Sequence, residues 1–221
     1  MYSILPVSGI LGGIFVVTRL RFGYANCFLL SGQDGSILID TCNYYNGEGI
    51  LKLVKDKNVK LILLTHGHFD HVGSAQYLAK RLNVPIAMSE KDLPIIGKGE
   101  DSILLGTTAL GKLFSFFSQP VLKRAKYSIF KPEVLLKEGQ ELNEYGVNAK
   151  ILELPGHTKG TVGVLTEDGE IVVGDAMFNM LRPTVARIFE DEESMRKSVD
   201  KIKNSGAKTI FVGHGKPIKN I

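Results

Sequence analysis

The stretch LLTHGHFDHVG, residues 63–73, contains three of the five histidines of this chain together with an aspartate. It overlaps the end of the apolar run VKLILL at residues 59–64, which predicts a short strand buried on both faces. Residues 72–82 then predict a helix. A loop between a strand and a helix can turn neighbouring side chains toward one point. The stretch therefore indicates a polar site at the end of a strand in an α/β fold.

The spacing of these side chains favours a metal site. His66, His68 and His71 lie at positions i, i+2 and i+5, with Asp70 beside the last of them. Neutral imidazole and carboxylate are ligands that zinc and similar divalent ions prefer. A single histidine is more often structural, but three within six residues, next to an aspartate, are difficult to explain in that way.

The two remaining histidines and a second aspartate occupy similar positions. His157 lies in the turn PGHT after the predicted strand KILEL, and His214 lies in GHG after the predicted strand KTIF. Asp175 ends the apolar run IVVGD. Every histidine of the chain is thus a candidate ligand at the end of a predicted strand.

Length and composition limit the classes of function. The 221 residues are enough for a sizeable core, and we expect a single domain over residues 1–221. The net charge is +4, but the lysines are scattered, so we expect no nucleic-acid partner and a small-molecule substrate, with at most a weak preference for anionic ones. Lys159, Arg182, Arg187 and Lys216 lie near the motifs and could bind a substrate carboxylate, although such residues are usually surface charges.

The N-terminal segment does not have the pattern of a leader peptide. Met1–Thr18 carries no charged side chain, but Pro6, Gly9 and Gly12 interrupt its apolar run and Arg19 comes after it. A signal peptide needs the opposite order of charge and apolar residues, and a spanning helix needs about 20 continuous apolar residues. We expect no membrane span and a cytoplasmic location, and the oligomeric state stays open.

The segment CFLLSGQDGSILIDTC, residues 27–42, predicts a hairpin with Asp34-Gly35 as a two-residue turn. In that register Cys27 and Cys42 would face one another across the strands. Because cytoplasmic thiols normally stay reduced, two free, packed cysteines are the expected state and a disulfide is the alternative.

Strand and helix signals alternate along the rest of the chain and form two similar halves. Helices are predicted at residues 46–56 and from Asp191, as the N-cap, to Asn204, with Gly206 just past the end. Further strands are predicted at about residues 2–5, 14–20, 84–89, 148–154, 161–175 (a hairpin around Asp168-Gly169) and 207–215.

Residues 94–132 separate the halves and predict a helical insertion. Leu110, Leu113, Phe114 and Phe117 fall at helical spacing, and Pro120 lies where the helix must stop or kink. Three interpretations stay open: a helical pair packed on the core, a lid over the active site, or a contact with a membrane surface.

With these motifs in view, the sequence resembles the metallo-β-lactamase superfamily of hydrolases. The motif HxHxDH corresponds to His66, His68, Asp70 and His71, and the resemblance extends through ANCFLLSG, SILIDT, PGHT, GDAMF and the final GHG. It covers nearly the whole chain except residues 94–132. PGHTKGT and GDAMF are most similar to the corresponding motifs of glyoxalase II and its relatives. The resemblance is therefore to glyoxalase II-type members that lack that family's C-terminal substrate-binding region.

The resemblance implies a four-layered αβ/βα sandwich with a two-metal site along one edge. It implies one ion at His66, His68 and His157, the other at Asp70, His71 and His214, and Asp175 as the bridge. In such centres a hydroxide lies between ions about 3.5–4 Å apart. The expected ions are zinc, with iron or manganese as alternatives. Asp70 would also be a catalytic residue that orients the hydroxide or shuttles a proton.

The implied activity is hydrolysis of a thioester, ester or lactone. Three alternatives stay open: a phosphodiesterase or nuclease using the same metal pair, iron-dependent oxygen or persulfide chemistry, and a non-catalytic metal-binding interaction module. A lactamase is disfavoured because Asp175 stands where many zinc lactamases carry cysteine. His68 disfavours the flavodiiron type, in which that position is usually glutamate, and the complete ligand set disfavours the module.

Overall fold

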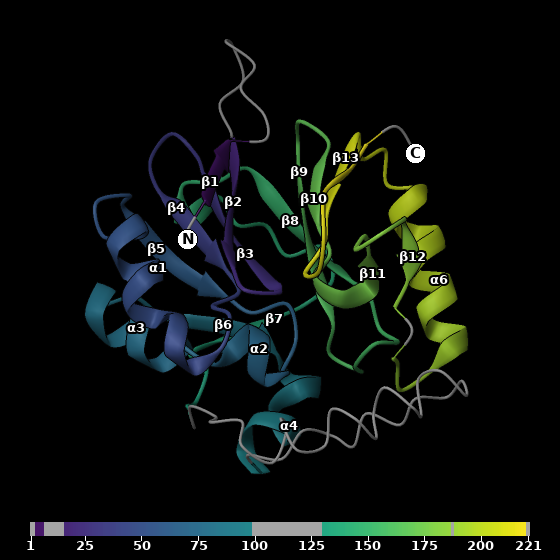
Figure 1. Cartoon of the computed structure of the whole chain (residues 1–221), viewed down its shortest axis with the longest axis horizontal. Helices are drawn as coiled ribbons and strands as arrows, with labels where there is room; N and C mark the ends of the chain where they lie inside the picture. The colour runs from purple at the N-terminus through teal and green to yellow at the C-terminus, as the bar shows by residue number, and fades with distance from the viewer. Residues whose placement is uncertain (1–2, 7–15, 99–129, 187, 220–221) are drawn as a thin grey trace.

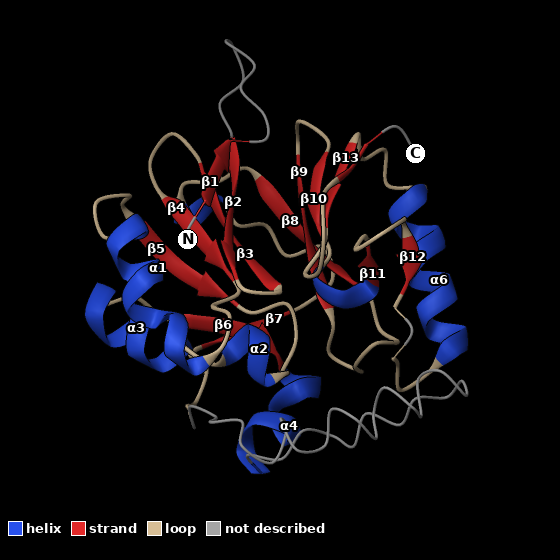
Figure 2. Cartoon of the chain, in the orientation of Figure 1, coloured by secondary structure: helices blue, strands red, loops and turns tan. Residues whose placement is uncertain are grey.

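Two β-sheets face one another at the centre of the molecule, and helices cover their outer faces (Figures 1 and 2). The computed structural model describes residues 3–6, 16–98, 130–186 and 188–219. Helices α1 and α3 cover one side, and α6 covers the opposite side (Figure 1). The two outer helical layers and the two sheets between them form the αβ/βα sandwich that the family resemblance implies.

The larger sheet has seven strands in chain order. They are β1 (Ser3–Pro6), β2 (Val16–Phe22), β3 (Ala25–Ser31), β4 (Ser36–Ile39), β5 (Val59–Leu63), β6 (Ile86–Ser89) and β7 (Val134–Leu136). Successive strands from β1 to β4 pair antiparallel, and successive strands from β4 to β7 pair parallel. The change to parallel pairing brings the ends of β4, β5 and β6 to one edge of this sheet.

The smaller sheet has five strands in the order β14-β13-β10-β9-β8. They are β8 (Ala149–Glu153), β9 (Val162–Thr166), β10 (Glu170–Val172), β13 (Thr209–Phe211) and β14 (Ile218–Lys219). Strands β10 and β13 are parallel, and β9 is antiparallel to both β8 and β10. Strands β8, β10 and β13 therefore also end at a common edge. A separate two-stranded ribbon consists of β11 (Met177–Phe178) and β12 (Thr184–Val185).

The helices lie on the outer faces of both sheets. They are α1 (Gly47–Val54), α2 (Phe69–Val72), α3 (Ala75–Leu82), α4 (Leu93–Lys98) and α6 (Glu192–Lys203). Four short 3-10 turns are η1 (Tyr44–Asn46), η2 (Glu90–Asp92), η3 (Asn143–Tyr145) and η4 (Gly174–Ala176). None of the helices in the described part of the chain has the length and apolar character that crossing a membrane requires.

Alternating side chains of the strands build three apolar layers. On β5, Leu61 and Leu63 face the space between the sheets, whereas Ile62 packs with α1 and α3. On β13, Phe211 belongs to the layer between the sheets and Ile210 to the layer under α6. The largely apolar run at residues 59–64 predicts a strand that is apolar on both faces, because both faces of a central sheet are covered.

Most predicted elements are confirmed with small shifts of their ends. Asp191 is the N-cap of α6 and accepts a hydrogen bond from the backbone N–H of Glu193, and Gly206 adopts a φ of 79° just past the end of that helix. The predicted helix at residues 72–82 is instead two helices, α2 and α3. The break lies at Gly73 and Ser74. These residues donate hydrogen bonds to the carbonyls of residues 42 and 43, so the loop after β4 interrupts the helix.

The predicted turn Asp34-Gly35 between β3 and β4 is wrong by one residue. Ser31 pairs with Ser36, and the backbone N–H of Gly32 donates to the carbonyl of Gly35 at 2.9 Å, so the chain reverses at Gln33-Asp34, and this register does not pair Cys27 with Cys42. A Cβ atom on Gly35 would lie 2.5 Å from the carbonyl oxygen of Tyr145, so a contact with η3, which is distant in sequence, sets the shape of the loop. Both cysteines are buried and free, as expected.

Most of the predicted insertion at residues 94–132 lies outside the described residues. The described parts are α4 before it and the chain from residue 130 onward. The predictions for Leu110, Leu113, Phe114 and Phe117, and for Arg187, therefore stay predictions.

The contact between the two sheets yields a stability prediction. Phe28 and Phe211 come from opposite sheets, are fully buried and meet edge to face with ring centroids 5.7 Å apart. Phe28→Ala should lower the free energy of unfolding in urea by about 3–5 kcal/mol, since it leaves a cavity at the centre of the core. The control is Leu135→Ala, at a side chain that is 40% exposed, which should cost under about 1 kcal/mol. Equal losses for the two variants would contradict this account of the core.

Candidate metal centre

The seven side chains singled out in the sequence lie together at the edge where strands of both sheets end. His66 and His68 follow β5, Asp70 and His71 lie in α2, His157 follows β8, Asp175 lies in η4 after β10, and His214 follows β13. Residues separated by up to about 150 positions in the sequence thus meet because the strands that precede them end at one place.

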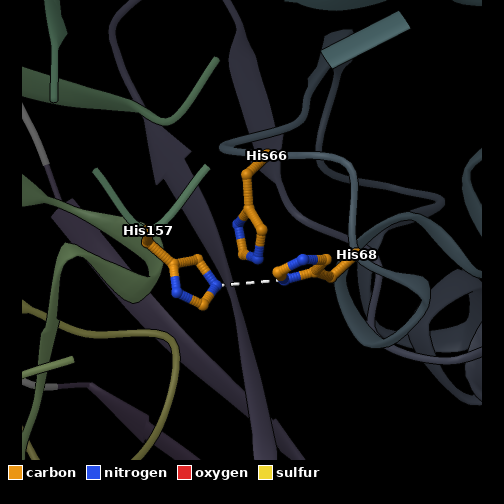
Figure 3. A group of neighbouring side chains, drawn as sticks. All are labelled: His66, His68 and His157. Carbon is orange, nitrogen blue, oxygen red and sulfur yellow. Dashed lines mark hydrogen bonds between the residues drawn. The ribbon is translucent and has the colours of Figure 1, made fainter. Parts of the chain in front are cut away.

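His66, His68 and His157 form the first group. One ligand atom from each lies within 4.8 Å of those of the other two, and all three residues are buried. The rings point toward a common centre, and Nε2 of His157 lies 3.0 Å from Nδ1 of His68 (Figure 3). Three neutral ring nitrogens around one point make a typical site for a divalent transition-metal ion.

Asp70, His71 and His214 form the second group, and their ligand atoms satisfy the same distance limit. Oδ2 of Asp70 lies 3.4 Å from Nε2 of His214 and 3.9 Å from Nε2 of His71. This group combines imidazole with carboxylate, so it offers negative charge as well as nitrogen lone pairs.

Asp175 lies between the two groups. Its Oδ1 is 3.4 Å from Nε2 of His71, and its Oδ2 is 3.6 Å from Nε2 of His157 and 3.3 Å from Nε2 of His214. Gly213 leaves room for this carboxylate, because a Cβ atom there would collide with Oδ1 of Asp175. Asp175 is therefore placed to serve both groups.

Several buried polar atoms of this cluster have no hydrogen-bond partner. They are Nε2 of His66, His68 and His71 and Oδ1 of Asp175. Buried polar groups are almost always hydrogen-bonded, because an unpaired one costs free energy on desolvation. A bound cation would satisfy the inward-facing nitrogens and the carboxylate at the same time, so the donor set fits one or more divalent metal ions.

Hydrogen bonds on the far side of three rings fix their orientation. Nδ1 of His157 donates to the carbonyl of Ile188 at 2.7 Å, and Nδ1 of His214 donates to the carbonyl of Tyr24 at 3.0 Å. Nδ1 of His71 lies 2.9 Å from a carboxylate oxygen of Asp40. With the proton on Nδ1, the Nε2 lone pair of the neutral ring faces the centre, as in known metal-binding histidines.

Asp40 was not predicted as a functional residue, although, like Asp175, it is an aspartate directly after an apolar strand. It is fully buried and accepts hydrogen bonds from the backbone N–H and the hydroxyl of Thr65, both at 2.8 Å. The Thr65 hydroxyl, which donates its hydrogen bond to Asp40, lies 3.1 Å from Nδ1 of His66 and can accept a hydrogen bond from it. Asp40 thus orients His71 directly and His66 through Thr65.

The pKa values divide the cluster into two parts. Burial lowers the pKa of His66 well below its ordinary value, and burial together with His157 lowers that of His68 to about 3. Burial also acts to lower the pKa of His71 and His214, but Asp175 and the other nearby carboxylates outweigh it and raise these values to about 9 and about 11. In the absence of metal, His71 and His214, which lie beside the carboxylates, are therefore protonated at neutral pH. Their positive charge lies where a bound cation would also be favoured.

Asp92 is a second buried carboxylate that the sequence did not single out. It follows β6 and accepts hydrogen bonds from the backbone N–H groups of Gly67 at 2.9 Å and Gly160 at 2.7 Å and from the hydroxyl of Thr158 at 2.8 Å. Gly67 lies between two histidines of the first group, and Thr158 directly follows the third. A Cβ atom on Gly160 would lie 2.5 Å from Oδ1 of Asp92, so the fit is close. Asp92 thus holds the two loops of the first group together.

The loop that carries His214 is held by the β2–β3 hairpin. Nδ2 of Asn26 donates to the carbonyls of Val212 at 2.9 Å and Gly215 at 3.0 Å. Arg19 donates to the carbonyl of Gly215 at 3.0 Å, and burial lowers the pKa of its guanidinium. These bonds fix the backbone on both sides of the histidine.

The described residues among the predicted substrate-binding cations are exposed. Lys159, Arg182 and Lys216 all lie at the surface, and none of them takes part in a salt bridge between described residues.

Comparison with known protein families gives an independent result. The family described as the metallo-beta-lactamase superfamily matches residues 20–214. The probable metallo-hydrolase YflN of Bacillus subtilis is 24% identical over 204 residues, which are 84% of this chain and 73% of that protein. The hydroxyacylglutathione hydrolase GloC of Haemophilus influenzae is 34% identical over 158 residues, which are 69% of this chain and 66% of GloC.

Solved structures show the same fold. The crystal structure of TTHA1623, described as a di-iron-bound form, superimposes with a TM-score of 0.67 and 24% sequence identity, over 97% of this chain and 94% of that one. At this level of identity the likeness concerns the fold.

The position of Asp92 yields a test of how the first group is held. Asp92→Ala would leave two backbone N–H groups and a hydroxyl without their acceptor, so the loops of His68 and His157 should separate. We expect metal affinity to fall by about 10- to 100-fold, measured by competition with a coloured chelator. Glu90→Ala, which removes an exposed carboxylate from the same 3-10 turn, is the matched control and should bind metal normally. Unchanged affinity in Asp92→Ala would show that these bonds do not position the histidines.

Proposed function

The chain belongs to the metallo-beta-lactamase superfamily and is an enzyme of the metallohydrolase type, and on that premise we propose that it hydrolyses a thioester, ester or lactone at a dinuclear metal centre. The observation that carries this proposal is the convergence of five imidazoles and two carboxylates at one place, where Nε2 of three of the histidines and Oδ1 of Asp175 are buried without a hydrogen-bond partner. Such a donor set is more than an isolated structural ion needs, since a structural zinc ion takes four ligands.

We assign the ligands according to the two groups of neighbouring donor atoms. One ion would be held by His66, His68 and His157 and the other by Asp70, His71 and His214, and Asp175, whose oxygens lie 3.3–3.6 Å from nitrogens of both groups, would serve both. Zinc is the proposed metal, because imidazole with a few carboxylates suits it. Iron is the main alternative, since the same ligands accept it and TTHA1623 was solved in a di-iron-bound form.

Divalent ions at this position supply Lewis acidity and lower the pKa of a water molecule toward about 7. The protein's own groups would then manage the proton. Asp70 has the more accessible of the two carboxylates, with its side chain 12% exposed against 6% for Asp175. Its Oδ2 lies 3.4 Å from Nε2 of His214, and we propose that it orients the attacking water and accepts its proton.

An acyl substrate is favoured over a phosphodiester by two considerations. GloC, whose name describes hydrolysis of a glutathione thioester, is 34% identical to this chain over 158 residues. The lysines of the chain form no long run of the kind that binds a nucleic-acid backbone. We propose a small-molecule acyl substrate, with exposed Arg182 and Lys216 as candidate contacts for any negative charge on it.

One turnover assay tests the proposal. Metal-loaded protein is offered an acyl thioester, a lactone and a phosphodiester, each with and without a chelator. Chelator-sensitive cleavage of acyl substrates alone is the expected result. Cleavage of the phosphodiester alone would replace the proposal with phosphoryl transfer. No cleavage of any of the three would leave iron-dependent oxygen chemistry or a non-catalytic metal scaffold as the better account.

A variant of the shared carboxylate gives the sharper prediction. Asp175→Ala should lower the metal-to-protein ratio and reduce acyl hydrolysis by at least about 10³-fold, because both groups lose a ligand. Far-UV circular dichroism should be unchanged, since the sheets do not depend on this side chain. The matched control is Asp56→Ala, at a side chain that is 83% exposed, which should keep metal and activity. Full activity in Asp175→Ala would refute the assignment of Asp175 to both ions.

A further inference from the structure

Three apolar side chains of the β11–β12 ribbon, Phe178, Met180 and Leu181, follow Asp175 closely in the sequence, and we call them the apolar flank of the candidate centre. The first strand of the ribbon begins two residues after Asp175 and ends at Phe178. The ring of Phe178 lies edge-on to two of the proposed ligands, with centroids 5.3 Å from that of His214 and 6.4 Å from that of His157. Phe178 is only partly buried, so it lies at the border between the centre and solvent.

The chain that follows Phe178 is fastened to the loop of His214. The backbone N–H of Asn179 donates to the carbonyl of His214 at 3.0 Å, and the N–H of Lys216 donates to the carbonyl of Asn179 at 2.9 Å. A Cβ atom on Gly215 would lie 2.7 Å from the backbone nitrogen of Met180. The backbone of Met180 is therefore held next to the segment that carries a proposed ligand.

Two large apolar side chains follow, and both face solvent. Met180 is 66% exposed and Leu181 is 101% exposed. Exposed large apolar side chains are few among the described residues: the others are Tyr24, Tyr44, Tyr45 and Leu135, and of these only Tyr45 is more exposed than Met180. Tyr24 also borders the centre, since its ring stacks on that of His214 at 5.8 Å. Exposed apolar side chains close in sequence to a polar site commonly mark a ligand-binding surface.

We propose that Phe178, Met180 and Leu181 bind an apolar group of the substrate, so that the enzyme prefers acyl chains of several carbons. This inference rests on the proposed function. The ligand cluster is polar and suits the reacting carbonyl, so the apolar part of a substrate gains most by lying on the adjacent flank. Exposed Arg182 follows Leu181 and would instead favour a short acyl chain with a terminal carboxylate, so the test separates these two substrates.

The test measures kcat/KM of the metal-loaded protein on thioesters of one thiol that carry acetyl, butanoyl, hexanoyl, octanoyl or succinyl groups. Each methylene that becomes fully buried can raise kcat/KM by up to about 4-fold. We expect the octanoyl ester to exceed the acetyl ester by at least about 10-fold, and the butanoyl ester to exceed the succinyl ester. A flat series, or a preference for succinyl, would overturn the proposal.

A double variant tests the residues themselves. Met180→Ser with Leu181→Ser should lower the octanoyl-to-acetyl ratio toward one, whereas Leu135→Ser, at an exposed apolar residue of β7, should leave both rates as they were. Equal loss on all substrates in the double variant would indicate a merely structural role and would overturn the proposal.

A binding measurement separates this inference from the proposed reaction. Calorimetric titration with octanoate, acetate and succinate does not require turnover. Tighter binding of octanoate than of acetate, lost in the double variant, would support the flank even if no thioester is cleaved and the proposed reaction fails. Turnover of thioesters without any preference for longer chains would support the proposed hydrolysis and refute the proposed role of the flank in substrate binding.

Discussion

The structure depends on compensating a buried group of polar atoms that cannot all be satisfied by the protein alone. Oδ1 of Asp175 and Nε2 of His71 both lack hydrogen-bond partners, although they lie only 3.4 Å apart. A buried charge without compensation costs several kcal/mol. Without metal, protonation meets part of this need, because the carboxylates raise the pKa of His71 to about 9 and that of His214 to about 11. Nε2 of His66 and of His68 still lack a hydrogen-bond partner. A cation at the centre would bind these nitrogens and neutralise the carboxylates at the same time.

The fold meets this constraint by ending strands of both sheets at one place. Each sheet contributes three strand ends: β4, β5 and β6 lead to Asp40, His66 and Asp92, and β8, β10 and β13 lead to His157, Asp175 and His214. Most side chains on these six strands belong to the apolar layers, so the candidate ligands come together where the strands stop. Asp40 and Asp92 are not among the candidate ligands. Asp40 hydrogen-bonds to Thr65 and His71, and Asp92 hydrogen-bonds to the loops of Gly67 and Gly160, so together they fix the positions of the histidine rings.

The sequence predicts those features of this arrangement that depend on residues close together in the chain. The histidine cluster, the apolar run before it and the N-cap of α6 are all short-range signals, and the structure brings the seven predicted side chains together. Asp92 carries no such signal, because its role depends on contacts with Gly67 and Gly160, which are 25 and 68 positions away. The register of the β3–β4 hairpin was missed for the same reason, since the contact of its loop with η3 is invisible in a local pattern. The roles of the seven side chains as ligands stay proposals.

The geometry of the candidate centre also explains why its ligands alone cannot identify the substrate. Imidazole and carboxylate around two ions suit an acyl or a phosphoryl group equally, so discrimination must come from the surroundings. Each methylene buried on an apolar surface raises kcat/KM by only about 4-fold, so a strong preference requires several such contacts. The flank can supply them in a fixed position, because the bonds of Asn179 to the loop of His214 place Phe178 and Met180 relative to the ligands. The loop that positions His214 thus also fixes the surface that would distinguish one acyl group from another.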